Sequence, residues 1–180
     1  MQDLDDYLWA RHAAERNAAN ARSNPAITDG SGMTDAQAAD ILAGRAVTLN
    51  GRTIQLSAQT LRGAAALANR VDAITNRTLD LLVEYKLETQ QTIDTWKRTY
   101  AHYAPLKRDM ESDANYSGAF NLGLGTGQGF DIRGAASRRA LGSKRSVTDV
   151  LANIAMQRER AIVRGEKNRV AQAVYGLALT

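Results

Sequence analysis

The chain has 180 residues, 44% hydrophobic and 23% charged, with a formal net charge of +4, no cysteine and only two histidines. This length suits one domain with a sizeable core, the absence of cysteine excludes disulfides and thiol chemistry, and the scarcity of histidine argues against an imidazole metal site. No apolar run approaches the roughly 20 residues of a membrane span and no signal peptide opens the chain, so we expect no membrane partner, metal or cofactor.

The first quarter of the chain predicts two helices joined by a loop. Residues 2–22 begin with acidic residues, which favour a helix N-terminus, and the loop at 24–32 is rich in turn formers. Thr34 and Gln37 are spaced as a capping box, which predicts a short helix that ends near Gly44. The first helix carries a loose apolar stripe formed by Leu4, Tyr7, Leu8, Ala14, Ala18 and Ala21.

Residues 47–56 give the strand signal. Two short runs of alternating apolar residues flank Asn50-Gly51, a pair favoured in two-residue hairpin turns. An isolated hairpin is marginal in water, so we expect this one to pack on the helices.

Two further helices follow. Residues 58–87 hold apolar residues at three- and four-residue spacing, and Thr89 caps a helix that Pro105 ends. The short break at 86–88 predicts an antiparallel helical hairpin. The long stripe contains Leu61, Ala64, Leu67, Ala68, Val71, Ile74, Leu81, Leu82 and Tyr85, and the next helix has one face of Ile93, Trp96, Tyr100 and Tyr103.

Residues 106–145 predict no regular element, and we expect a flexible glycine-rich, basic loop. The positive charge is concentrated towards the C-terminus, since residues 105–180 carry 12 Lys/Arg against 7 Asp/Glu, whereas residues 1–104 carry 11 against 12. Such a basic segment can meet a phosphate backbone, although few aromatic residues accompany it. Its cationic residues, within an acid-free stretch at 132–148, are Arg133, Arg138, Arg139, Lys144 and Arg145.

The last helix is predicted to begin at Ser146, with Asp149 completing a capping box, and to reach about residue 179. It would be roughly 50 Å long. Arg160, Arg164 and Lys167 form a basic ridge that could join the nucleic-acid contact, or be a solvated face paired with Glu159 and Glu166. Near its end, a seam of Val163, Val170, Val174 and Leu177 would pair with a second copy or dock on the first helix.

Neither of two candidate chemical sites is supported by its context. The glycines between 123 and 129 could cradle a phosphate, but no strand precedes them and no Walker Lys-Ser/Thr pair follows. Tyr100, His102, Tyr103 and Lys107 suggest acid–base chemistry, but the sequence places no carboxylate to orient His102, and the aromatic stripe explains the tyrosines as core. We therefore predict no catalytic residues.

Four stretches of the chain together resemble an accessory region of the large polyvalent proteins of tailed bacteriophages. They lie at 5–17, 30–39 and 95–108, with a last one at 151–153 continued at 161–170. The resemblance implies a helical region, delivered with the phage genome, that has no catalytic residues. Its most specific elements are Trp96, Tyr100, Tyr103, Pro105 and Leu106 in the third stretch and Glu166, Lys167, Asn168 and Arg169 in the fourth.

The sequence therefore predicts a mainly α protein, a helical bundle with one small β-hairpin and a long Gly-rich basic loop. Residues 1–105 would form the core, and the helix at 146–180 would pack on it or extend from it. The preferred function is a non-enzymatic phage or prophage interaction domain with a protein partner, in the virion or the host bacterial cytoplasm. The alternatives are a nucleic-acid-binding module using 133–145 and an inhibitor of a host defence system, and a homo-oligomer is also possible.

Overall fold

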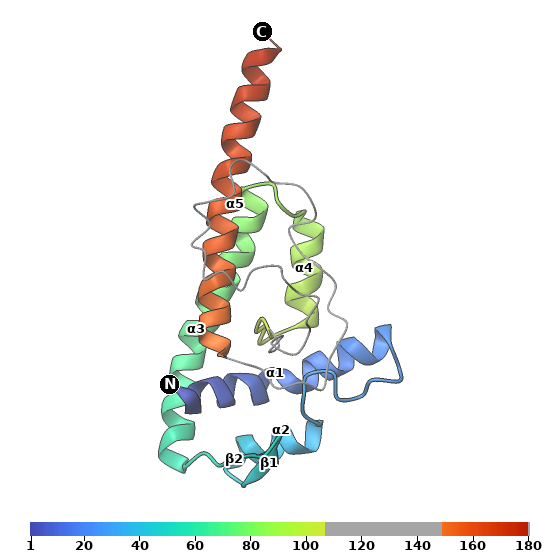
Figure 1. Cartoon of the computed structure of the whole chain (residues 1–180), viewed down its shortest axis with the longest axis vertical. Helices are drawn as coiled ribbons and strands as arrows, with labels where there is room; N and C mark the ends of the chain where they lie inside the picture. Colours follow the sequence, from blue (N-terminus) through green and yellow to red (C-terminus); the bar gives the residue numbers. More distant parts are fainter. Residues whose placement is uncertain (107–148, 180) are drawn as a thin grey trace.

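The computed structural model describes residues 1–106 and 149–179, which are mainly helical with one two-stranded hairpin, as predicted (Figure 1). The elements are α1 (Gln2–Ser23), α2 (Asp35–Leu42), β1 (Val47–Leu49), β2 (Arg52–Ile54), α3 (Ala58–Glu84), α4 (Gln90–Thr99) and α5 (Val150–Ala178). α4 and α5 both pack on α3, α1 crosses the lower end of this group, and α2 and the hairpin lie beneath α1 (Figure 1). Apart from Leu106, the predicted glycine-rich loop lies outside the described residues.

The predicted local signals around α2 and the hairpin are confirmed. Thr34 and Gln37 make both hydrogen bonds of the capping box, and α2 ends before Gly44, whose φ of +76° suits glycine. Asn50 and Gly51 both have positive φ, as a type I′ turn requires, and Val47 pairs with Ile54 across the antiparallel strands. The hairpin packs on the helices as expected, because both of these side chains are buried in the core shared with α1.

α3 ends at Glu84, three residues before the predicted end. Lys86 takes a left-handed conformation with φ of +56°, and the N–H of Leu87 donates to the carbonyl of Leu82, which closes the helix in a Schellman-type turn. The predicted apolar stripe is partly wrong, since Leu67 and Ile74 are 47% and 45% exposed. The positions that complete the buried face are Thr75 and Thr78, whose hydroxyls donate to backbone carbonyls one turn earlier.

α4 runs back along α3, which confirms the predicted antiparallel helical hairpin (Figure 1). Thr89 caps it as expected. The helix ends at Thr99 and not at Pro105, because Tyr100 is already in an extended conformation with φ of −130° and ψ of 101°. Tyr100 and Tyr103 therefore lie beyond the helix, on either side of a turn at 101–102, and their rings contact His12 of α1.

α5 begins at Val150, so the predicted start at Ser146 and its capping box with Asp149 are wrong. Asp149 is itself the N-cap, with its carboxylate accepting from the N–H of Ala152, while Ser146 lies outside the described residues. The carboxylate of Asp5 on α1 accepts a hydrogen bond from the N–H of Leu151, in the first turn of α5, at 2.8 Å. Burial raises the pKa of the Asp5 carboxyl, and this hydrogen bond opposes the rise.

α1 lies in the middle of the larger core and buries more than its predicted stripe. Ala14 and Ala18 of that stripe are exposed, whereas His12, Asn17 and Asn20 are buried. α1 contacts α2, α3 and α5, so polar side chains are buried on sides that a single apolar stripe does not reach. The buried apolar residues of this core are Leu8, Trp9, Ala10, Ala13, Met33, Ala38, Ile41, Val47, Ile54, Leu56, Ala68, Ala104, Val150 and Ile154.

Asn17 fixes the loop between α1 and α2 through its side-chain amide. The amide nitrogen donates to the Met33 carbonyl at 3.0 Å and to Asp35 Oδ1 at 2.7 Å, and the amide oxygen accepts from the N–H of Ser31 at 2.8 Å. Trp9 donates its indole N–H to the Ser31 carbonyl at 2.9 Å. These contacts satisfy buried backbone groups of a segment that has no regular structure of its own.

A smaller second core joins α3, α4 and α5. Its buried residues come from α3, α4 and α5, so this core determines how these helices lie relative to one another. They are Leu79, Leu82, Ile93 and Ala161, with Val83, Leu87 and Trp96 packed against them.

Candidate functional site

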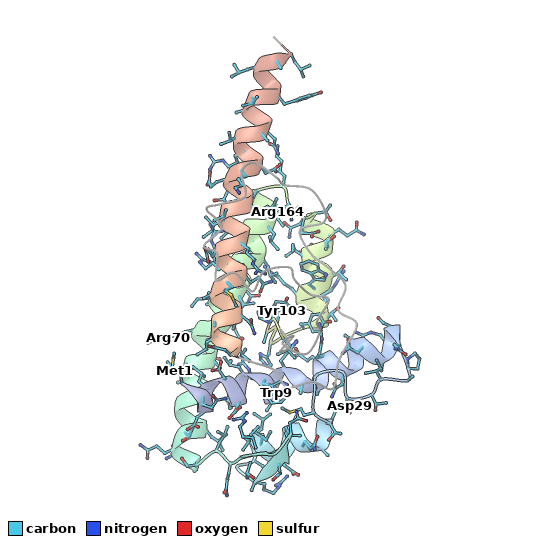
Figure 2. All side chains as sticks on the ribbon, viewed as in Figure 1. Met1, Trp9, Asp29, Arg70, Tyr103 and Arg164 are labelled. Carbon is cyan, nitrogen blue, oxygen red and sulfur yellow. The ribbon has the colours of Figure 1, made fainter. Side chains whose placement is uncertain are left out.

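A cluster of aromatic and titratable side chains lies where the segment after α4 meets α1, at the position of Tyr103 in Figure 2. His12 is fully buried, with ring centroids 5.3 Å from Tyr100 and 5.9 Å from Tyr103. The two tyrosine rings are 5.8 Å apart. Three rings at these separations pack in tilted and edge-to-face arrangements, which favours the interpretation that the tyrosines belong to the core.

Two carboxylates face this cluster, and sequence reasoning missed both. Glu15 accepts from the N–H groups of Ala101 and His102 at 3.1 Å, and its Oε2 lies 3.6 Å from His12 Nδ1. The expectation that no carboxylate is placed beside His102 is wrong, because Asp72 Oδ2 lies 3.4 Å from its Nδ1. Glu15 follows His12 by three residues, and this spacing in the sequence puts both on one helix face. Asp72 reaches His102 only through the tertiary fold, so no pattern in the sequence indicates their contact.

Burial controls the ionisation of this cluster. It lowers the pKa of His12 and raises the pKa of Tyr103. Burial also opposes ionisation of Glu15, but the contacts with His12 and with the N–H of His102 outweigh it, so the pKa of Glu15 is held below its ordinary value. At neutral pH the cluster therefore holds a neutral imidazole beside a carboxylate.

The cluster has the residues of an acid–base site, but its buried imidazole and its two carboxylates are held by contacts within the fold. His12 is 0% exposed, Glu15 is bonded to two backbone N–H groups, and Asp72 accepts from Arg11 at 2.5 Å. A general acid or base must reach the proton that it transfers, and these groups are committed to neighbours within the fold. The arrangement joins α1 to α3 and to the segment after α4.

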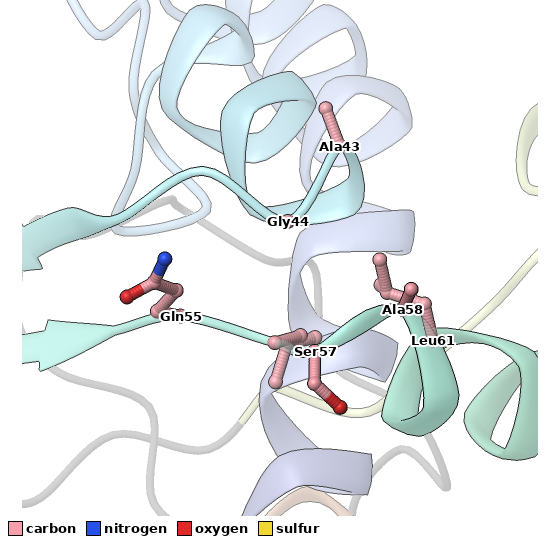
Figure 3. A pocket seen from close by; sticks show the side chains of 7 residues that line it. Ala43, Gly44, Gln55, Ser57, Ala58 and Leu61 are labelled. Atoms are coloured by element: carbon pink, nitrogen blue, oxygen red, sulfur yellow. The ribbon is translucent and has the colours of Figure 1, made fainter.

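A pocket of about 480 Å³ lies elsewhere, between the end of α2, the hairpin and the start of α3 (Figure 3). None of its lining residues is titratable, and the hydroxyl of Ser57 already accepts from the N–H of Thr60 as the cap of α3. The pocket therefore offers shape without acid–base chemistry. It is lined by Ala43, Gly44, Gln55, Leu56, Ser57, Ala58 and Leu61.

The residues near 100 on which the predicted resemblance rests lie in packing positions. Trp96 packs against the second core, and Leu106 packs against the first. Tyr103 accepts from the side chain of Gln157 on α5 at 3.4 Å, so it also contributes to the position of α5. Pro105 lies in the segment after α4, between Ala104, which is buried, and Leu106.

The motif residues near 166 form the joint between α5 and the end of α3. Tyr85 packs against Gly165 so closely that a Cβ there would lie 2.1 Å from the ring. Asn168 donates to the Tyr85 carbonyl at 2.8 Å, and the Tyr85 hydroxyl donates to Glu166 at 2.7 Å. This last bond raises the pKa of Tyr85 and lowers that of Glu166.

The structure describes only part of the predicted nucleic-acid site. Arg160, Arg164 and Lys167 lie on α5, where Arg160 is exposed and the other two are half-buried. Glu166, one of the two acids expected to pair with this ridge, pairs with Arg169 at 3.2 Å. The other five predicted residues lie outside the described part of the chain, as do Lys107 and the glycine loop at 123–129; the five are Arg133, Arg138, Arg139, Lys144 and Arg145.

The upper end of α5 projects beyond the rest of the fold (Figure 1). We call residues 170–179 the α5 tip, and no residue in it is charged. No other described helix or strand reaches it, and its side chains extend from the helix on all sides (Figure 2). The exposed fractions are 45% for Val170, 60% for Val174, 67% for Tyr175, 76% for Leu177 and 70% for Leu179.

This projection corrects one of the two expectations for the seam. Val170, Val174 and Leu177 do not dock on the first helix, because α1 meets the opposite end of α5 at Leu151. A helix that is apolar on every side is normally covered, and singly exposed apolar residues are common whereas contiguous groups mark contact sites. The tip is therefore the best candidate for a functional surface among the described residues.

Two further kinds of site are absent from the described ranges. Residues 1–106 and 149–179 hold no group of three or more His, Asp or Glu side chains arranged to bind a metal ion. None of the helices described is both long and apolar enough to cross a bilayer.

Comparison of the chain with protein-family models, curated proteins and solved structures finds no match in any of the three. The resemblance to phage polyvalent proteins therefore stays a prediction from the four stretches.

Proposed function

We propose that this chain is a protein-interaction module without catalytic activity, and that the α5 tip is its contact surface. The observation that carries the proposal is a ten-residue helix end without charge whose apolar side chains are up to 76% exposed. Covering such side chains contributes about 25 cal/mol for each Å² of apolar surface removed from water. An apolar groove on a protein partner would supply that cover.

The aromatic cluster supports a role without catalysis. Its titratable groups lie at a helix junction, where Glu15 and Asp72 bond to backbone N–H groups and to Arg11. The family-motif residues at the Tyr85–Asn168 joint are likewise used in packing. Taken together, these contacts favour a rigid helical body that presents α5.

The resemblance of the four stretches supports a phage or prophage origin. The module would then act in the virion or in the host bacterial cytoplasm, alone or within a larger protein, on a phage or host protein. Inhibition of a host defence system would be one form of such binding.

The experiment is a capture assay with matched variants. The tagged chain is incubated with extracts of bacteria before and after phage infection, and each captured protein is identified, purified and tested again in isolation. Val174→Asp should abolish binding because it places a charge within the contact, whereas Leu67→Asp, at an exposed apolar position on α3, should leave binding unchanged. Equal binding by both variants would contradict the α5 tip as the surface.

A nucleic-acid-binding role is the second candidate, favoured by the exposed Arg160 and by the acid-free stretch at 132–148. Labelled DNA and RNA duplexes titrated at several salt concentrations test it. Binding through phosphates should weaken steeply with salt, and the double change Arg138→Ala with Arg139→Ala should reduce the slope by about two contacts. Binding that ignores salt would exclude this candidate.

A further inference from the structure

The apolar face of α5 that points away from the bundle has the spacing of a coiled-coil seam. Val163, Lys167, Val170, Val174 and Leu177 follow one another at intervals of four, three, four and three residues, and we call them the α5 seam. This spacing places them along one line of a helix, as the a and d positions of a heptad do. Lys167 is the one charged member.

The chain's own core leaves the upper part of this seam uncovered, whereas Val163 and Lys167 at its lower end are half-buried. Ala161 and Gly165 are buried against the bundle, with Gly165 beneath the Tyr85 ring. At 100° per residue, Val163 lies about 200° around the helix from Ala161, so the seam and the buried face of α5 point in opposite directions. Beyond residue 169 the seam members Val170 and Val174 are 45% and 60% exposed.

The seam complements itself when two copies run antiparallel. With the pair centred on Gln172, Val170 of one copy faces Val174 of the other, and Lys167 faces Leu177. In coiled coils antiparallel a and d positions meet in this way, and the methylene groups of lysine can cover an apolar neighbour while its ammonium reaches water. The flanking residues Ala171, Ala173 and Ala178 are small, which lets two helices approach closely.

Charge decides against the parallel arrangement. Two parallel copies would place Lys167 against Lys167 in the same layer, and like charges facing each other are unfavourable. In the antiparallel pair the uncharged residues 170–174 of both copies form the centre, and the lysines lie at opposite ends. Only one direction of pairing therefore buries apolar residues without opposing two cations.

We infer that the partner of the α5 tip is a second copy of this chain, bound antiparallel along the α5 seam. The inference rests on the proposed function and names its partner. The two helices overlap over residues 165–179, roughly 22 Å. The 15 overlapping residues are fewer than the roughly 20–30 residues a side of a standard interface, so we expect a dimer that forms at about micromolar concentrations and dissociates on dilution.

Sedimentation of the full chain over a range of concentrations tests the dimer. The parent chain should pass from monomer to dimer, Val174→Asp should stay monomeric, and Leu67→Asp should behave as the parent. Circular dichroism of both variants checks that the fold is kept, which is expected because both positions are exposed. A parent chain that stays monomeric at every concentration, or a Val174→Asp variant that still dimerises, overturns the inference.

Cross-linking tests the direction of pairing, and the chain lends itself to it because it has no cysteine. A mixture of Lys167→Cys and Leu177→Cys chains should form a disulfide between copies under mild oxidation. Lys167→Cys alone should not, since its two copies lie ten residues apart along an antiparallel pair, about 15 Å. Ready cross-linking of Lys167→Cys alone would show a parallel pair and overturn the inference.

Two results separate this inference from the function on which it rests. A monomeric chain that binds a different purified protein, and loses it on Val174→Asp, overturns the second copy but keeps the interaction surface. A monomeric chain that binds anionic phospholipid vesicles through Val174 overturns both. A dimer that needs Val174 supports both.

Discussion

A neutral histidine inside the aromatic cluster makes the stability of this fold depend on pH. Neither ring nitrogen of His12 has a hydrogen bond among the described residues, and Glu15 Oε2, at 3.6 Å, is beyond hydrogen-bond distance. The other groups at this site are Arg16 on α1 and His102, Tyr100 and Tyr103 after α4. Burial lowers the pKa of His12, so the unfolded chain takes up a proton at a higher pH than the folded chain does.

We expect acidification to destabilise the fold through His12. At pH above the ordinary histidine pKa of about 6.5 the residue is neutral in both states, and below it the free energy of unfolding should fall by at most about 1.4 kcal/mol per pH unit. His12→Phe should remove this part of the pH dependence, because the phenyl ring keeps the packing and cannot be protonated. Urea unfolding between pH 5 and 8 measures it.

His102 provides the control, since it is the other of the two histidines and its side chain is 42% exposed. His102→Gln should leave the contribution of His12 to the pH dependence in place. If His12→Phe and the parent lose stability in parallel on acidification, His12 is not the group responsible.

The buried polar residues are also where sequence reasoning failed. Asn17 and His12 look like surface residues because their polarity breaks the apolar stripe of α1, and Ala14 and Ala18 look like core although both are exposed. A periodic pattern assumes that a helix has one buried face, whereas α1 contacts α2, α3 and α5. Asn17 is stable inside the core because its amide is hydrogen-bonded. Its partners lie 14 to 18 positions further along the chain, so no local sequence pattern predicts these bonds.

At the scale of single elements, the starts of α2 and α4 and the turn of the hairpin were predicted, whereas the start of α5 was not. Thr34, Asn50-Gly51 and Thr89 act as predicted, because each depends on contacts within four residues. The helix ends were less well predicted. α3 ends at Glu84 without a glycine, and α4 ends five residues before Ala104, so the boundary depends on where the chain must turn to meet α1.

Lys86, just after the end of α3, has a strained backbone conformation that a substitution should relieve. Its φ of +56° is left-handed, a region where a Cβ costs roughly 1 kcal/mol and glycine does not pay that cost. We expect Lys86→Gly to stabilise the fold by about 0.5–1 kcal/mol, part of the gain being lost to the greater freedom of glycine in the unfolded chain. Urea unfolding of the variant measures the change.

Gly44 supplies the opposite control. Its φ is +76° and a Cβ would lie 3.0 Å from the Leu56 carbonyl, so Gly44→Ala should destabilise by about 1 kcal/mol or more. A Lys86→Gly variant less stable than the parent would mean that the lysine side chain contributes more than its backbone strain costs.

At the scale of the whole molecule, helical content and the hairpin could be predicted and the placement of α5 could not. The sequence left two places for the seam, and the choice depends on contacts such as Gly165 against Tyr85 and Asp5 with the N–H of Leu151. These join residues 80 to 146 positions apart, as do the bonds between Tyr85 and α5. The position at which α5 docks determines which of its residues project from the fold. The candidate surface therefore follows from the tertiary contacts and not from the apolar pattern alone.

The hydrogen bond between Asp5 and the N–H of Leu151 joins residues that are synthesised far apart in time, which affects folding during translation. Residues emerge from the ribosome at roughly 5–20 per second, so α1 and α3 are complete several seconds before α5 can cover them. During that interval the surfaces of Ala68 and Leu79 that later face α5 are open to water and to other nascent chains. Because α5 follows α1 and α3 in the chain, this core cannot be completed until translation has passed residue 165.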